Sequence, residues 1–370
     1  MKAAESGKAS EGSATKGQTT KMTVTIYDVA QRAGVSISTV SRVLNNNPNV
    51  LEDTRQKVLK AIEELQFKPN PIARGLVVKQ TNLIEVFFSW AGPVFNMAGY
   101  QFNLQSAWYV GLLNGINEVV QEKQYGLLIN TISGVFDPQE VYRKVSSKAV
   151  DGVLLVSPYL EEKDVLRMMT QRIPMVLIGY RTVDPSVDYV DSDNRGAAIK
   201  VVDYLTGLGH KKIACITGQV KTSRNAADRL EGFREACAKH HLTLPEDYLV
   251  EGDFLKKSGS DAMRKLMALP DRPTAVFASN DLMALGAWDV AKEMGLTVGK
   301  DVALVGFDDI AEACTPPYSL TTVQQDYRAM SVEATQMLIE KINHPDNWKP
   351  RQVLVPTQLV ERQSSGSKKK

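Results

Sequence analysis

The pattern of hydrophobic positions changes along the chain. Beyond residue 80, short β-branched apolar runs alternate with stretches whose apolar residues recur at helical spacing, and a turn-rich segment at 181–188 separates two such series. The runs lie at 83–88, 125–131, 152–157 and 175–180 in the first series, and at 212–218, 275–280 and 302–308 in the second. Strands that alternate with crossover helices make a parallel sheet covered on both faces. The pattern therefore predicts two α/β lobes with a cleft between them.

The segment before residue 66 has helical periodicity instead. Three short helical patterns span 25–65 and are separated by Gly34 and by a cluster of Asn and Pro at 45–48. In the third pattern the apolar residues recur at i, i+3, i+4 and i+7, which is one helical face. We therefore expect a small helical domain ahead of the two lobes.

Within this domain, residues 26–45 have the spacing of a helix-turn-helix. Ala30 allows two helices to approach closely, and Gly34 permits the left-handed backbone that the turn needs. Ser36 can cap the second helix, whose first turn reaches base edges in a major groove, and Arg42 can donate two hydrogen bonds to a guanine. The alternative is a three-helix domain with no ligand. The residues expected in the core of the helix-turn-helix are Val29, Val40 and Val43.

Two further segments flank the helical domain. Residues 1–22 contain no aromatic residue and little apolar surface, which predicts a disordered tail. Asn70 can cap and Pro71 can open a short helix that holds Gly75 in its interior. A helix that is so short and contains glycine is marginal alone, so we expect a hinge at 70–80 that orders on binding.

Composition and charge narrow the function further. The formal net charge of +2 gives no global field for a nucleic acid or a membrane, but residues 23–80 carry eight basic and five acidic side chains, which suits an anionic partner for the head alone. Three cysteines without a C-x-x-C pair argue against a disulfide framework and a zinc site. No apolar stretch has membrane-spanning length and no secretory signal is present, so we expect a cytoplasmic protein.

These segments resemble the lactose/galactose-repressor (LacI/GalR) family over about residues 23–362. The resemblance implies an α plus α/β fold: a helix-turn-helix head with a hinge helix, then a two-lobed sensor domain like the periplasmic binding proteins. It also implies a homodimer that binds a palindromic operator in double-stranded DNA. The segments that carry it are 26–45, FKPN at 67–70, ARGL at 73–76, GHKKIACITG at 209–218, RLEGF at 229–233, PTAVFASNDLMALGA at 273–287, VALVGFDD at 302–309 and LTTVQQD at 320–326.

The resemblance carries over DNA-contacting positions one by one. Leu76 matches the hinge leucine that wedges into the central minor-groove step, and Ala73 belongs to the same hinge contact. The expected base readers are Ile37, Ser38 and Arg42, with Asn49 beside them. The positions that match phosphate contacts are Thr25, Tyr27, Thr39, Ser41, Asn45 and Thr54.

A small polar effector would bind between the lobes, and every buried hydroxyl of such a ligand needs a partner. Polar residues at strand ends can supply these partners. The resemblance assigns effector contacts to Arg229, which the sequence places at the opening of a helical turn, and to Asn280 and Asp308, with Phe254 and Tyr327 as aromatic walls. We expect Asp281 to be a helix N-cap and Asp309 to be a surface charge.

The segment 87–109 is longer than in relatives and holds eight of the aromatic residues. Phe87 and Phe88 are expected in the strand core, whereas Trp108 and Tyr109 align with the effector site. The rings can stack on the C–H faces of a sugar, or they can bury an enlarged loop. For Phe95, Tyr100 and Phe102 the sequence does not decide between these two roles. The segment favours a sugar that is larger or less polar than a simple hexose.

We expect a tail at 1–22, the helix-turn-helix domain at 23–69, the hinge at 70–80, the sensor at 81–363 and a second tail at 364–370. The first lobe is expected at about 81–190 and 325–352, and the second at about 191–324 and 353–363. No leucine heptads follow residue 363, so a dimer is favoured over a tetramer.

The sequence thus predicts a DNA-binding transcriptional regulator, a repressor controlled allosterically by a small molecule, with a sugar as the leading effector. One alternative keeps the DNA-binding role with a purine or a phosphoprotein corepressor, and a weaker alternative is a solute-binding transport protein. We expect no enzyme, no metal site and no cofactor, because no nucleophile–base pair and no phosphate loop accompany the acidic residues.

Overall fold

The computed structural model describes residues 24–44, 47–67, 80–90, 107–133, 137–156, 165, 167–168 and 173–366. The chain divides into two compact units, Met1–Val78 and Lys79–Lys370. The predicted N-terminal tail, residues 367–370 of the predicted C-terminal tail, the hinge residues up to 79 and most of the aromatic segment, including Phe95, Tyr100 and Phe102, lie outside the described residues. Ser364 and Ser365, which were also expected in the C-terminal tail, are buried instead. No described helix has the length and hydropathy of a membrane crossing.

The described part of the first unit contains three helices: α1 (Ile26–Ala33), α2 (Ile37–Leu44) and α3 (Glu52–Glu64). Gly34 ends α1 with a φ of 67°, so the left-handed conformation predicted for the turn is confirmed. The side chains of Val29, Val40 and Val43 are buried and pack on Val58 of α3. The three helices therefore close one small apolar core, as the helix-turn-helix pattern requires.

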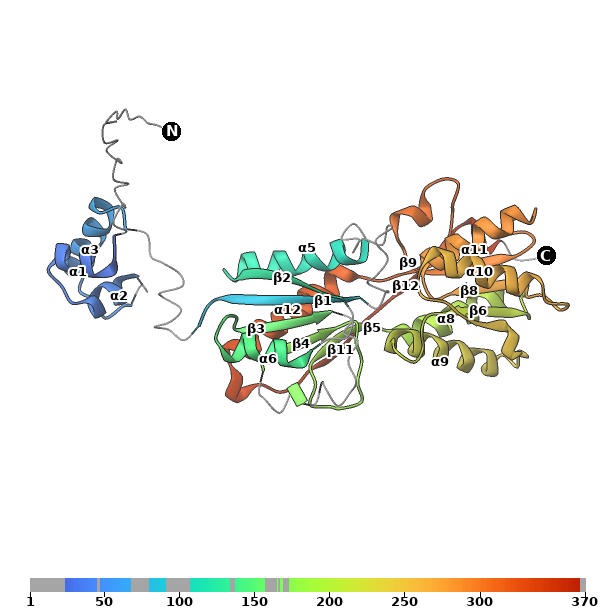
Figure 1. Ribbon diagram of the computed structural model, residues 1–370, viewed down its shortest axis with the longest axis horizontal. Coiled ribbons are helices and arrows are strands. Elements are labelled where there is room, and N and C mark those ends of the chain that lie inside the picture. The colour runs from blue at the N-terminus through green and yellow to red at the C-terminus, as the bar shows by residue number, and fades with distance from the viewer. Residues whose placement is uncertain are drawn as a thin grey trace, which may run out of the picture. The chain divides into compact units, whose positions relative to one another are not determined.

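The second unit contains two six-stranded sheets, each the centre of one lobe (Figure 1). In the first lobe all neighbouring strands are parallel and follow the order β11-β5-β4-β3-β1-β2. Their bounds are β1 Leu83–Trp90, β2 Gly126–Ser133, β3 Gly152–Val156, β4 Met175–Ile178, β5 Tyr189–Ser192 and β11 Gln352–Val355.

Helices cover both faces of the first sheet. α5 (Ala107–Glu122) and α12 (Tyr327–Asn343) pack on the face that presents Ile84, Val86 and Phe88, while α6 (Pro138–Ser146) packs on the face of Phe87. Successive residues of β1 thus enter opposite cores, as the two-fold period of a strand demands. Phe87 and Phe88 are strand core, as predicted.

The second lobe repeats the arrangement in the order β12-β10-β9-β8-β6-β7, with only β12 antiparallel to its neighbour. Its strands are β6 Ile213–Thr217, β7 Leu249–Glu251, β8 Ala275–Ala278, β9 Ala303–Asp308, β10 Thr321–Gln324 and β12 Gln358–Val360. Helices α8 (Asn194–Gly207) and α9 (Arg224–Lys239) cover one face, and α10 (Lys256–Met267) and α11 (Asp281–Glu293) cover the other. Short 3-10 turns lie at Glu246–Tyr248, Ala311–Cys314, Pro345–Asn347 and Gln363–Ser365.

The chain passes between the lobes where these elements succeed one another: after β5 into α8, after β10 into α12, and after β11 into β12. Asp188 fixes the returning segment, because its fully buried carboxylate accepts from Lys341 Nζ at 2.7 Å, Trp348 Nε1 at 2.9 Å and the Arg351 backbone N–H at 2.7 Å. The last crossing follows Val355, a few residues later than the sequence suggests.

Candidate functional sites

The exposed surface of α1 and α2 is the first candidate site. Tyr27 at the start of α1 is 67% exposed and Ile37 at the start of α2 is 39% exposed, so both side chains are accessible to a partner. Ser38, Arg42 and Asn49 are also exposed. The predicted base readers thus lie on the outside of the head, whereas the valines of the same helices are buried.

Arg42 differs from two other arginines of the head. Arg32 forms an ion pair with Glu64, and Arg55 lies 3.6 Å from Glu52 and donates to the Asn47 carbonyl at 2.8 Å. Arg42 forms no ion pair with any residue that the structure describes. Its guanidinium is therefore free for an anionic or acceptor-rich partner.

Hydroxyl groups hold the two helix starts. Thr25 donates through its backbone N–H and its hydroxyl to Asp28, each at 2.7 Å, and these bonds lower the pKa of Asp28. The Ser36 hydroxyl accepts from the Thr39 N–H at 3.2 Å, so the predicted cap of α2 is confirmed. Ser41 and Thr54 are partly buried, whereas Asn45, Ala73 and Leu76 lie outside the described residues.

The second candidate site is a polar cluster centred on Arg229. This residue lies within α9, not at the opening of a helical turn as the sequence suggested, and its side chain is 4% exposed. The guanidinium donates through Nε to Asn194 Oδ1 at 2.8 Å and through Nη1 to the Ser279 carbonyl, and it lies 3.6 Å from the Phe307 ring centroid. Nη2 donates to no described residue. Burial lowers the pKa of Arg229, while the carboxylates of Asp308 and Asp191 oppose this shift.

Asp308 ends β9 with a φ of 118°, a backbone conformation that aims its side chain away from the strand. Its carboxylate accepts from Gln325 Nε2 at 2.8 Å, and burial raises its pKa to about 6 against the opposing charge of Arg229. The Tyr327 hydroxyl donates to the Asp308 carbonyl at 3.1 Å. Asp308 of the second lobe is thus held by the start of α12 of the first lobe.

The aromatic residues predicted for the site fall into two groups. Trp108 and Tyr109 of α5 stack edge to face with ring centroids 4.7 Å apart, and Tyr109 packs in the core that also contains Tyr327. Phe254 belongs to the second lobe, adopts a φ of 67° and lies against Gly218, where any Cβ would overlap its ring.

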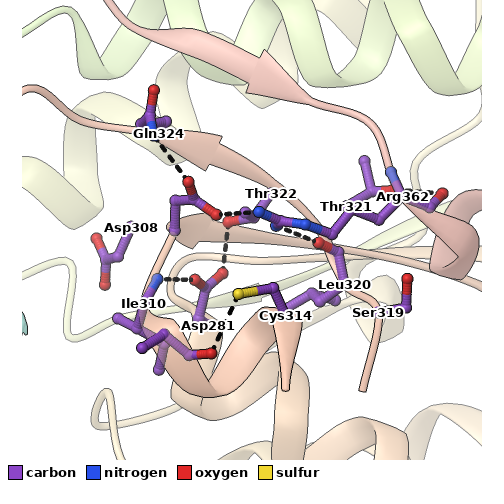
Figure 2. A network of polar contacts seen from close by, with 12 residues as sticks. Asp281, Asp308, Ile310, Cys314, Ser319, Leu320, Thr321, Thr322, Gln324 and Arg362 are labelled. Atoms are coloured by element: carbon purple, nitrogen blue, oxygen red, sulfur yellow. Dashed lines mark hydrogen bonds and ion pairs between the residues drawn. The ribbon is translucent and has the colours of Figure 1, made fainter. Parts of the chain in front are cut away.

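Two expectations about the strand ends are wrong. The N-cap of α11 is Asn280, whose side chain accepts from the Met283 N–H at 3.0 Å and also donates to the Phe254 carbonyl at 2.9 Å. Asp281 is instead fully buried and accepts from the Ile310 N–H at 2.9 Å and from the Thr322 hydroxyl (Figure 2). Burial, reinforced by Asp308, raises the pKa of Asp281 well above its usual range.

Asp309 is not a surface charge either. It accepts from Arg362 Nη2 and from Gln324 Nε2, at 2.7 and 2.8 Å, so it ties β10 to the C-terminal segment. Asp308 and Asp309 thus have different partners, Gln325 for the first and Arg362 with Gln324 for the second. Within the described ranges no group of three His, Cys, Asp or Glu residues is placed to hold a metal ion.

The sequence missed several residues of the cluster, namely Asn194, Ser279, Gln325 and Asp191. A second feature that it missed joins the lobes directly: Arg181 Nε, in the loop after β4, lies 3.7 Å from Asp228 Oδ2 of α9, and Arg224 Nε lies 3.3 Å from the other oxygen. Only the run DxDN at 191–194, two acids ahead of a helix start, could have pointed to part of this set.

Comparisons with known proteins match both units. Residues 25–70 match the family described as bacterial regulatory proteins, lacI family, and residues 202–365 match a periplasmic binding protein-like domain. The ribose operon repressor of Escherichia coli (strain K12) is 35% identical over 349 residues, which are 92% of this chain and 99% of that protein.

Two solved structures share the fold along most of the chain. A transcriptional regulator CelR–cellobiose complex is 32% identical with a TM-score of 0.67 and covers 92% of this chain and 99% of its own. The lac repressor dimer bound to operator and the anti-inducer ONPF is 28% identical with a TM-score of 0.77, and it covers 93% of this chain and 99% of its own.

Proposed function

The chain belongs to the lacI family of bacterial regulatory proteins, DNA-binding transcriptional repressors, and from this premise we propose that it binds a palindromic operator as a homodimer and responds to a sugar. Operator DNA lies in the cytoplasm, and we place the protein there. The observation that carries the proposal is the polar cluster around Arg229, whose buried cation keeps an unused donor beside a carboxylate.

In the proposed complex, α2 enters the major groove and Arg42 reads a guanine, which contributes roughly 1–3 kcal/mol of discrimination. Ile37 and Ser38 share its exposed surface, and Asn49 lies close after α2. Thr25, Tyr27, Thr39, Ser41 and Thr54 are proposed to hold phosphates, together with Asn45. Ala73 and Leu76 are proposed to insert at the centre of the operator.

In the proposed effector site, Nη2 of Arg229 donates to a ligand oxygen and Asp308 accepts from a hydroxyl group. A sugar hydroxyl is both donor and acceptor, so neighbouring hydroxyls of one ring can satisfy both residues. Asn280 contributes through the polar atoms that its cap and the Phe254 carbonyl leave free. Phe254, Trp108, Tyr109 and Tyr327 supply the apolar walls that the C–H faces of a sugar need.

A sugar is favoured over a purine because a carboxylate lies beside the unused donor of Arg229. Asp308 acts electrostatically on this buried cation and accepts from Gln325 through one oxygen, so its carboxylate keeps acceptor capacity for a hydroxyl group. A polyol brings many hydroxyl donors, whereas a purine brings few. The cellobiose bound by the similar regulator CelR agrees with this preference and with a sugar larger than a hexose.

Operator binding is tested first. The full-length protein selects duplexes from a random library, and the recovered sites are aligned. We expect a palindrome, with Arg42→Ala losing selectivity at one base pair per half-site. Lys60→Ala, which removes one exposed positive charge from α3, serves as the control and keeps the same sequence preference. Recovery of unrelated sequences would contradict the proposed reading head.

The effector is tested by the shift in Tm in a panel of ribose, glucose, cellobiose, hypoxanthine and glucose 6-phosphate. A ligand at 100 times its Kd stabilises the protein by about 2.7 kcal/mol. We expect a shift with a neutral sugar, absent in Arg229→Lys because a lysine cannot donate in the same fork geometry. A shift with hypoxanthine alone overturns the sugar proposal and leaves the operator proposal standing.

A further inference from the structure

Asp191 is a fully buried acid in β5, three residues before α8 begins in the second lobe. Its Oδ1 accepts from the Ser192 backbone N–H at 2.7 Å and from Asn194 Nδ2 at 3.3 Å. Its other oxygen, Oδ2, has no hydrogen-bond partner among the residues that the structure describes. A buried oxygen without a hydrogen-bond partner is costly, so its presence here calls for an explanation.

Asn194 links this acid to the effector site. The side chain of Asn194 is buried, and its Oδ1 accepts from Arg229 Nε at 2.8 Å. Because an amide carries its donor and its acceptor on opposite ends, this bond forces Nδ2 to face Asp191 and the Ser192 carbonyl, the latter at 3.1 Å. The hydrogen bonds therefore run in one direction, from Arg229 through Asn194 to Asp191.

We propose that Asp191 is a positioning residue for effector binding: it fixes the Asn194 amide, and that amide aims the Arg229 guanidinium at the ligand. The inference rests on the proposed effector site. Asp191 belongs to the sheet of the first lobe, whereas Asn194 and Arg229 belong to helices of the second. These three hydrogen-bonded residues, the Asp191–Asn194–Arg229 relay, therefore span the crossing between the lobes. A rotation of one lobe against the other would change the direction in which the Arg229 guanidinium points.

The charge of Asp191 sets how tightly the side chains of Asn194 and Arg229 are held. Burial raises the pKa of Asp191 to about 7, and the charge of Asp228 adds to the shift while Arg229 opposes it. The groups that face Asp191 are Arg229 and Asp228 from α9, Asn194 from α8, and Tyr189 from its own strand. An ionised acceptor binds an N–H more tightly than a neutral one, so Asn194 and Arg229 are held more firmly above pH 7.

The test observes Arg229 directly and needs no ligand. In full-length ¹⁵N-labelled protein, the Nε–Hε signal of Arg229 is identified by its loss in Arg229→Lys. We expect this signal to titrate with a midpoint near pH 7, to lose that transition in Asp191→Asn while keeping any change that Asp308 causes near pH 6, and to broaden or exchange rapidly in Asp191→Ala. Asp193→Asn is the matched control, because Asp193 caps α8 through the Gly196 N–H and does not contact Arg229 or Asn194 in the described hydrogen bonds.

The outcomes separate this inference from the proposed sugar effector. An Arg229 signal that titrates identically in Asp191→Asn and the natural protein overturns the positioning role, whichever ligand binds. If the signal behaves as expected while ribose, glucose and cellobiose all leave Tm unchanged, the sugar proposal fails and the relay stands. Should Asp191→Ala not fold, the comparison of Asp191→Asn with Asp193→Asn still decides.

Discussion

Replacing Asp308 by Asn should stabilise the ligand-free protein and weaken its response to the effector. Burial holds the pKa of Asp308 at about 6 instead of the ordinary 3.8. The folded state binds the proton of Asp308 more tightly than the unfolded state does, which stabilises the fold at low pH. This stabilisation is lost as the pH rises through the range between the two pKa values. The loss is complete above about pH 7 and absent near pH 4.

The magnitude follows from the two values. Each pH unit corresponds to 1.36 kcal/mol, so the ionised Asp308 costs about 3 kcal/mol, and the remaining exposure of the side chain reduces this to about 2 kcal/mol. Asn can still accept the Gln325 hydrogen bond, as the protonated acid does, and it tolerates the φ of 118° about as well as Asp. We expect Tm to rise by about 4–8 °C at pH 8 and to change little at pH 4.

The assay is thermal unfolding followed by tryptophan fluorescence at pH 4, 6 and 8 at one protein concentration. All four tryptophans lie in the second unit, so the signal reports the unit that contains Asp308. Asp309→Asn is the matched control with the opposite sign, because it leaves the partly buried Arg362 without its ion pair. The shift in Tm produced by a sugar should shrink in Asp308→Asn.

The reasoning is refuted if ligand-free Asp308→Asn is no more stable than the natural protein at pH 8. It also fails if the gain is the same at pH 4 as at pH 8, because a gain without pH dependence cannot come from the ionisation of Asp308. A gain at pH 8 with an unchanged sugar response would leave the electrostatic argument intact and remove Asp308 from the effector contacts.

Two further substitutions test the surroundings of the site. Gly218→Ala should push the Phe254 ring out of place, lower stability by about 1–3 kcal/mol and reduce the sugar-induced shift in Tm; an unchanged shift would show that Phe254 is no wall of the site. Asp281→Ala should cost about 2–5 kcal/mol at pH 5 by fluorescence-monitored denaturation, because the Ile310 N–H and the Thr322 hydroxyl lose their acceptor, whereas Thr322→Val should cost less; equal costs would contradict this account.

The alternation of strands and helices could be predicted because the central strands are continuous apolar runs. Strands β5, β7, β10, β11 and β12 escaped the pattern, since they are only three or four residues long and mix polar with apolar residues. They are strands because partners far along the chain pair with them, as β11 pairs with β5. Long-range pairing of this kind leaves no periodic signal in the sequence.

For the site, the sequence indicated strand ends but not the partners of each side chain. Arg229 and Asp308 follow from motif and resemblance, whereas Asn194 and Gln325 are defined only by the tertiary contacts that they make. Asn280 and Asp281 are both good capping residues, and a difference of one residue in the start of α11 decides which one caps. The polar partner of Asp309, Arg362, lies more than fifty residues away and was invisible to local patterns.

In the effector site that we propose, the buried charges would couple a ligand to the arrangement of the lobes. Tyr327 and Gln325, at the entry to α12, hold Asp308 of the second lobe, and the Arg181–Asp228 ion pair joins the lobes elsewhere. A ligand shifts the balance between two lobe arrangements only through a difference in affinity for them. The empty site disfavours the ionised form of Asp308. A ligand hydroxyl that donated to Asp308 would stabilise this ionised form. It would do so only in the lobe arrangement in which Tyr327 and Gln325 contact Asp308. If Asp308 binds the effector as proposed, ligand binding and lobe arrangement are coupled through this residue, whose ionisation destabilises the empty site.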